Sequence, residues 1–201
     1  MKITALKPAV KTAGRWNVFV DGSYSFSLDE TQLLAHGLKI NLELDDAKLA
    51  ELREDSLFGK AYARALDLIL RRLRSRKEIV DYARRKEWSD DIAQRVVARL
   101  EARGYLNDEQ FAQSWVRSRE AIKPSSRRKL ALELRQKGVA SEIIQTVLAE
   151  AGEHDELATL RRIVLKKQAR YSDQQKFMAY LARQGFAFDS IKQVLGETEV
   201  G

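Results

Sequence analysis

The sequence predicts a mostly α-helical protein made of three tandem three-helix units, preceded by a small antiparallel β-hairpin or sheet. Signals for helix starts and helix breaks recur three times between Phe58 and Gly196. Basic residues occupy the same place in each recurrence, and β-forming segments around an Asp-Gly pair occur only near the N-terminus. A recurring unit of this length is typical of folds in which neighbouring units bury each other's apolar faces.

The N-terminal segments RWNVFV and SYSFSL flank Asp21-Gly22, and residues 3–6 offer a third short strand. Asp-Gly between alternating segments favours a type I′ hairpin turn, which needs positive φ at both central residues. Period-2 alternation assigns two apolar faces, formed by Trp16, Val18 and Val20 and by Tyr24, Phe26 and Leu28. We expect this sheet to serve packing, and an exposed aromatic face for nucleic-acid bases is the alternative.

Helices are expected from Asp29-Glu30 to near Gly37 and from Asp45 to about Glu54, which completes a first domain at residues 1–56. The three units then cover residues 57–106, 107–152 and 153–201. Their first helices are predicted at residues 58–72, 108–119 and 153–167. Acidic residues at Asp45-Asp46 and Asp90-Asp91 are interpreted as helix starts, where they favour the helix dipole.

Two further helices follow in each unit and are separated by a short break. The second helices start at Ser75, Ser126 and Ser172, 51 and 46 residues apart, and the breaks lie at Glu87-Trp88, Gly138-Val139 and Gly185-Phe186. Ser75 with Glu78, and Ser172 with Gln175, fit a capping box. Gly138 and Gly185 suit a helix C-terminus, where glycine best tolerates the left-handed conformation. The unequal spacing argues for old duplications rather than a regular solenoid.

Composition narrows the functional classes. The chain has 201 residues, of which 44% are apolar, and this fraction is sufficient for a hydrophobic core. It has no cysteine, so thiolate chemistry and zinc-thiolate sites are excluded. No apolar run approaches the roughly 18 residues of a membrane span, so a cytoplasmic protein without a membrane partner is expected. His36 and His154 are expected at the surface rather than as metal ligands. Nucleotide-binding loops and HExxH are missing, so no cofactor, metal or catalytic residue is predicted.

The net charge of +7 belongs to the helical units. Residues 1–56 hold 7 Lys or Arg against 9 Asp or Glu, whereas residues 57–201 hold 29 against 20. The basic residues form three clusters, each spanning the end of a unit's first helix and its second helix. Leu130 and Leu134 take buried i, i+4 positions, so the charges should lie on the opposite face.

One such cluster is most simply a solvated helix face, but three clusters at matching positions favour a stripe for a polyanion, whose phosphates repeat. We predict that this stripe binds nucleic acid or a protein filament on it. The predicted contact residues are Arg71, Arg72, Arg74, Arg76, Lys77, Arg127, Arg128, Lys129, Arg135, Lys137, Arg161, Arg162, Lys166 and Lys167.

Several segments resemble the RecX family of bacterial regulatory proteins. They are LRRLRSRKEIVDYARRKEW, LEARGYLNDEQFAQSWVRSRE and RRKLALELRQKGV, and the resemblance covers about 140 residues, 57 to 196. The N-terminal segment also resembles the β-hairpin extension of some members. The segment KPSSRRK departs from the family, whose members often have glycine before this helix.

The resemblance implies an elongated, curved array of three units that acts as a monomer and is not an enzyme. It implies binding to the RecA recombinase, as monomer and as nucleoprotein filament, with weak, sequence-independent binding to single- and double-stranded DNA. It further implies modulation, mainly inhibition, of the recombinase's ATPase, strand exchange and filament growth, within DNA repair and the SOS response.

Two other functional classes remain open from the residues alone. A helix-turn-helix DNA regulator could use residues 75–103, although no helix carries a clear set of base-reading side chains. A metal-dependent nuclease would need clustered carboxylates, and the acidic residues here are scattered.

Overall fold

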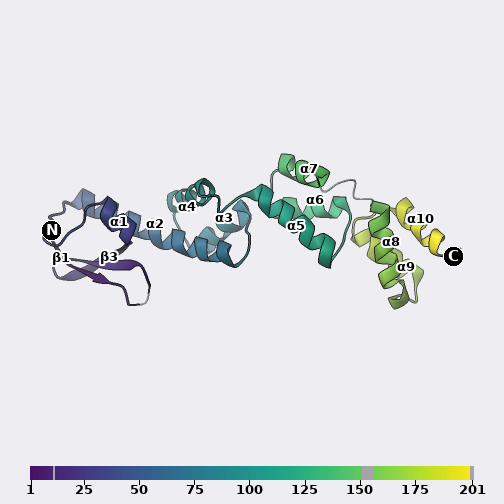
Figure 1. The fold of residues 1–201 in the computed structure, drawn as a ribbon, viewed down its shortest axis with the longest axis horizontal. Helices are drawn as coiled ribbons and strands as arrows, with labels where there is room; N and C mark the ends of the chain where they lie inside the picture. Colours follow the sequence, from purple (N-terminus) through teal and green to yellow (C-terminus); the bar gives the residue numbers. More distant parts are fainter. Residues whose placement is uncertain (11, 151–155, 200–201) are drawn as a thin grey trace. The chain divides into compact units, whose positions relative to one another are not determined.

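The computed structural model describes residues 1–10, 12–150 and 156–199 and is mostly helical, with a small antiparallel sheet at the N-terminus (Figure 1). The described chain forms two compact units. The first holds residues 1–72 and 82–105, and the second holds residues 73–81 and 106–201. None of the helices in the described ranges combines the length and the apolar character that a membrane span requires.

The N-terminal sheet has the order β1-β2-β3, formed by β1 (Ile3–Pro8), β2 (Arg15–Val20) and β3 (Ser23–Asp29). The predicted hairpin turn is confirmed, because Asp21 and Gly22 have φ of 47° and 83°. Val18, Phe26 and Leu28 are buried and pack with Leu49 and Leu52 of the following helix. The sheet therefore does serve packing, through one of its faces.

Tyr24 does not share the face of Phe26 and Leu28, so this part of the predicted alternation is wrong. The register shifts between Val18 and Phe19: Val18 pairs with Phe26, whereas Phe19 pairs with Tyr24. The additional residue on β3 is a β-bulge, which moves the residues beyond it to the other face. Tyr24 consequently stays 53% exposed, with its ring nearly perpendicular to the ring of Phe19.

The two helices predicted before and after residue 56 are one. After α1 (Glu30–Ala35), a single helix α2 (Asp46–Arg71) starts at the N-cap Asp45 and runs without a break, so the predicted domain boundary at residue 56 lies inside it. The predicted starts at Asp45-Asp46 and Asp90-Asp91 are confirmed. Nothing between Glu54 and Phe58 breaks a helix, and the buried Ser56 fastens this turn to Ser27 of β3.

The predicted pairs of helices are found in the order expected. They are α3 (Arg76–Arg85) and α4 (Asp90–Ala102), α6 (Arg127–Gln136) and α7 (Ser141–Glu150), and α9 (Gln174–Arg183) and α10 (Phe188–Glu199). The second and third pairs follow α5 (Asp108–Ile122) and α8 (Glu156–Lys167), which ends in a 3₁₀ turn, η1 (Gln168–Arg170). Predicted positions 153–155 and His154 lie outside the described residues.

Each of the last two repeats buries its own apolar cluster. Leu130, Leu134 and Val139 form the first with residues of α5 and α7, and Leu181 and Phe186 belong to the second. The start of α9 differs from the prediction, because Asp173 rather than Ser172 accepts from the amides of the first turn. An aspartate carboxylate is as good an N-cap acceptor as a serine hydroxyl, so the sequence alone did not discriminate between them.

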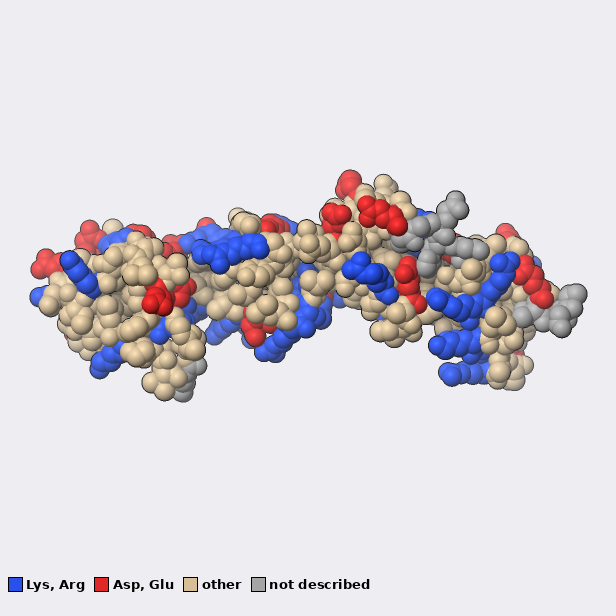
Figure 2. Space-filling view, in the orientation of Figure 1, with Lys and Arg blue, Asp and Glu red and all other residues tan. Residues whose placement is uncertain are grey.

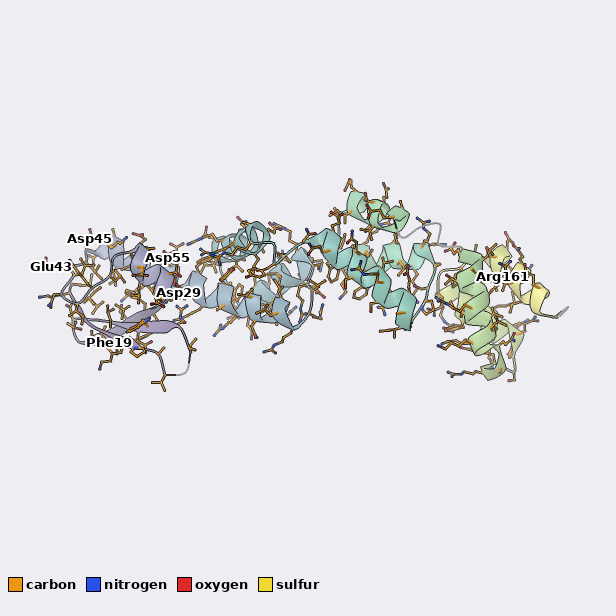
Figure 3. All side chains as sticks on the ribbon, in the orientation of Figure 1. Phe19, Asp29, Glu43, Asp45, Asp55 and Arg161 are labelled. Atoms are coloured by element: carbon orange, nitrogen blue, oxygen red, sulfur yellow. The ribbon has the colours of Figure 1, made fainter. Side chains whose placement is uncertain are left out.

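A polar network joins α1, α2 and α4 within the first unit. Asp55 of α2 accepts from Arg95 at 2.8 Å and contacts His36 Nε2 at 2.8 Å. The His36 side chain is only 14% exposed, so its expected surface position is wrong. Figure 3 shows Asp55 near Asp29, to which it is linked through the amide side chain of Gln32. Burial raises the pKa of Asp55, but hydrogen bonds from Arg95 and His36 outweigh it, so this pKa lies below its ordinary value.

We predict that Asp55→Asn lowers the free energy of unfolding at neutral pH by about 1–2 kcal/mol, because a neutral amide replaces a charge-assisted acceptor. A carboxyl group whose pKa is lowered by folding contributes stability above its unfolded pKa and loses it as pH falls through the folded pKa. The difference between wild type and variant should therefore shrink below about pH 4. Urea unfolding at a series of pH values measures it.

Asp67→Asn is the matched control for this network. Asp67 pairs with Arg71 at 2.8 Å, but the two side chains are 60% and 71% exposed, so the change should cost under about 0.5 kcal/mol. Equal effects of the two substitutions would contradict the role given to Asp55.

Candidate nucleic-acid and protein interface

The middle basic cluster lies on α6 within the second unit, and its members have different surroundings. Arg128 and Arg135 are exposed, and their side chains have no hydrogen bond, ion pair or ring contact with any described residue. Arg127 instead donates to the backbone oxygen of Leu148 at 2.6 Å. The structure thus separates two cations that face solvent from neighbours on the same helix that hold the fold together.

Lys137, the last predicted residue of this cluster, belongs to a contact between repeats. Its ammonium group lies 2.9 Å from the Glu78 carboxylate of α3 and 5.1 Å from the centre of the Trp115 ring. Its backbone oxygen accepts a hydrogen bond of 2.7 Å from the hydroxyl of Ser75, a residue without exposed surface. This contact joins the start of α3 to the end of α6, which are the second helices of two successive repeats. We call such a contact an inter-repeat joint.

The same joint occurs again between α6 and α9. Ser126, also without exposed surface, donates its amide to the backbone oxygen of Gln184 at 3.1 Å. Lys129 donates to the backbone oxygen of Arg183 at 3.1 Å and to the side-chain oxygen of Gln184 at 2.9 Å. Lys129 and Lys137 therefore have structural partners that the sequence did not reveal.

Glycine is required at both joints for two reasons. Gly138 and Gly185 have φ of 80° and 93°, which side chains rarely adopt. They also leave no room for a Cβ atom: one on Gly138 would lie 2.5 Å from Lys77 Cβ, and one on Gly185 would collide with the Ser126 hydroxyl. The glycines interpreted as helix ends thus also allow the next repeat to approach closely.

The third cluster lies on α8, and Figure 2 shows Lys and Arg side chains gathered over α8 and α9. Arg161, labelled in Figure 3, pairs with Glu197 at 2.9 Å, although both side chains are 43% exposed. Arg162 donates to the Glu120 backbone oxygen at 3.3 Å. Lys167 lies over the Tyr180 ring, and Lys166 is exposed without a described partner.

The first cluster is divided between the two units, with Arg71 and Arg72 in one and the remaining members in the other. Arg72 and Arg76 are exposed, whereas Arg74 is half-buried. Lys77 pairs with Asp81 at 2.6 Å. The Arg76 amide donates to Asp108 at 2.7 Å; burial raises the pKa of the Asp108 carboxyl, and this bond opposes the rise.

Three predicted residues, Arg128, Arg135 and Lys166, therefore remain exposed and without a partner among the described residues. Two of the three apolar residues at the helix breaks are buried: Val139 and Phe186 are 4% and 5% exposed, whereas Trp88 is half-buried. Within the described ranges, no group of three or more His, Cys, Asp or Glu side chains is arranged to hold a metal ion.

Three parts of this chain match models of known protein families. Residues 1–45 match the regulatory protein RecX N-terminal domain, residues 61–100 the first RecX three-helix domain, and residues 107–148 the second.

Curated relatives and solved structures agree with these matches. The regulatory protein RecX of Bacillus subtilis is 32% identical over 98% of this chain and 77% of its own length. That of Leuconostoc mesenteroides is 30% identical over 89% and 69%. A crystal structure of a regulatory protein RecX superimposes with a TM-score of 0.77, at 23% identity, over 97% of this chain and 98% of that one. The RecX structure from Lactobacillus salivarius gives 0.61, at 25% identity, over 72% and 98%. The chain belongs to the RecX family of regulatory proteins.

Proposed function

We propose that this chain binds the RecA recombinase and its DNA filament and modulates, mainly by inhibition, the recombinase's ATPase, strand exchange and filament growth. In this proposal it acts as a cytoplasmic monomer, as a regulator rather than an enzyme. It binds single- and double-stranded DNA weakly and without sequence preference. Membership of the RecX family supports the regulatory role, and the repeated basic helices support a repeating, negatively charged partner.

The observation that carries the proposal is the division of labour among the basic residues. At each joint, Lys129 or Lys137 fastens one repeat to the next. Arg128 and Arg135, on the same helix, face solvent without a described carboxylate. Cations that are held on a rigid helix and are not neutralised within the fold can release counterions from a polyanion when they bind it.

A filament offers the same surface repeatedly, so successive repeats of this chain could contact successive recombinase protomers or successive phosphates. Several weak contacts on one connected chain reinforce each other, because each bound repeat raises the effective concentration of the next. Bridging of protomers would hinder their addition and the cycling of nucleotide. Inhibition would then need no chemistry from this chain.

Co-sedimentation with recombinase filaments on single-stranded DNA tests the binding step. We expect the chain to pellet with the filament and to stay in the supernatant without recombinase and DNA. Equal recovery with DNA alone would favour a DNA regulator without a recombinase partner. Failure to pellet under any nucleotide condition would refute the proposal.

A further inference from the structure

A cleft of about 650 Å³ opens in the first unit between residues 9, 10 and 12 after β1, the polar face of the sheet and the C-terminal half of α2. Its volume lies within the range typical of ligand sites. The lining residues that matter are Arg15, Asn17, Tyr24, Lys60, Arg64 and Asp67. These residues are not among the predicted basic clusters.

The first cation of this cleft is buried. Arg15 is 8% exposed, and its guanidinium donates through Nε to the Ser27 hydroxyl and through Nη2 to the backbone oxygens of Ser27 and Ser56. Its Nη1 group makes no hydrogen bond to any described residue, and the Asp29 carboxylate acts on it through charge without forming an ion pair. A buried guanidinium held by neutral oxygens is a costly arrangement that an anionic ligand would compensate.

Two further cations line the α2 wall. Lys60 and Arg64 are one helical turn apart, and their side chains have no hydrogen bond or ion pair with a described residue. The one acidic residue in the lining, Asp67, is already paired with Arg71 at 2.8 Å. Side chains at this spacing are about 6 Å apart, so they can contact neighbouring phosphates of one strand.

An exposed aromatic ring faces the same cleft. The β-bulge in β3 takes Tyr24 away from the apolar face of the sheet, and its ring packs nearly perpendicular to that of Phe19, with 6.1 Å between the ring centres. Tyr24 is 53% exposed although it lies beside a cleft. Base stacking on such a ring contributes about 1–3 kcal/mol per base and does not depend on the base.

We propose that this cleft binds a segment of single-stranded nucleic acid, with phosphates on Lys60, Arg64 and Arg15 and a base against Tyr24. The combination favours nucleic acid over an acidic peptide, because a peptide carboxylate would use the cations but leave the ring without a stacking partner. The proposal rests on the proposed function only in that DNA is the ligand. It adds a site on the N-terminal unit, apart from the basic helices of the repeats.

Photocrosslinking of the full-length chain to an oligothymidylate that contains 5-iododeoxyuridine tests the base contact. We expect a crosslink to the peptide that contains Tyr24, its loss in Tyr24→Ala and its return in Tyr24→Phe, which keeps the ring. Absence of this crosslink while others form would overturn the proposal.

Binding of the same oligonucleotide, followed by fluorescence anisotropy, tests the cations. Lys60→Glu with Arg64→Glu should weaken binding at least about tenfold and reduce the slope of log affinity against log salt by about 0.7 per residue. The control, Lys2→Glu with Lys39→Glu, changes the charge of the same unit equally but lies outside the cleft. Equal effects of the two pairs would refute a nucleic-acid cleft. The cleft would also be refuted if polyglutamate were the only competitor that displaced the oligonucleotide probe from the wild type and the variants.

The two proposals fail in different ways. A cleft variant that inhibits recombinase like the wild type, together with no Tyr24 crosslink, would remove the cleft and leave the proposed function intact. A Tyr24 crosslink in a chain that never binds or inhibits recombinase would refute the proposed function and leave the nucleic-acid cleft intact.

Discussion

Gly138→Ala is expected to lower the free energy of unfolding by about 2–4 kcal/mol. A side chain at positive φ costs about 1 kcal/mol, and forcing a methyl group into a filled contact costs about 1–3 kcal/mol more. At Gly138 the new Cβ would meet the Lys77 side chain near its base, at Cβ, which cannot move aside without α3. The Ser75–Lys137 and Glu78–Lys137 contacts of the joint would weaken with it. Urea unfolding followed by circular dichroism measures the change.

Gly104→Ala is the control, because Gly104 has a similar φ of 71° but nothing within 4 Å of the position of a Cβ. It should cost about 1 kcal/mol, from backbone conformation alone. A cost for Gly138→Ala no larger than that for Gly104→Ala would show that the joint does not depend on close approach.

The double substitution Arg128→Glu with Arg135→Glu is expected to weaken binding to the recombinase filament and to flatten its salt dependence. Each phosphate contact contributes about 0.7–0.9 to the slope of log affinity against log salt, so removing two should lower the slope by about 1.4–1.8. Stability should change little, because both side chains are exposed and neither makes a hydrogen bond or ion pair with a described residue. Filament binding at several salt concentrations gives the slope directly.

Two comparisons make this result specific. Lys2→Glu with Lys39→Glu changes the net charge equally on the first unit and should leave the slope nearly unchanged. Lys129→Gln should instead lower stability, since it removes the contacts to Arg183 and Gln184. An unchanged slope in the Arg128 and Arg135 variant would mean that α6 does not face the polyanion.

Local signals predicted much of the fold. Asp21-Gly22 fixed the hairpin turn through backbone preference, Ser126 caps α6 where the sequence places a helix start, and α4 begins at Asp90 as expected. The features that were missed depend on contacts distant in sequence. The β-bulge follows a segment whose alternation is unbroken, and the continuity of α2 depends on Ser56 meeting the sheet.

The candidate site was predictable as a set of basic residues but not as a division between them. Lys129 and Arg128 are adjacent in sequence, yet one fastens α6 to α9 and the other faces solvent. The difference between Lys129 and Arg128 depends on the position of the next repeat, which contains α9. The cleft could not be predicted from the sequence for a related reason. Arg15 lies 45 residues before Lys60, and only the fold brings the two residues to one surface. The i, i+4 spacing of Lys60 and Arg64 was the one local signal.

The most direct test of the central claim is the rate of ATP hydrolysis by recombinase on single-stranded DNA as this chain is added. We predict a dose-dependent fall in the rate that saturates at fewer chains than recombinase protomers, because each chain bridges several. The Arg128 and Arg135 variant should need a higher concentration than the wild type to produce the same fall in the rate. This difference in concentration should increase as the salt concentration is raised. A rate that stays constant across a concentration range in which the chain is folded would contradict the account.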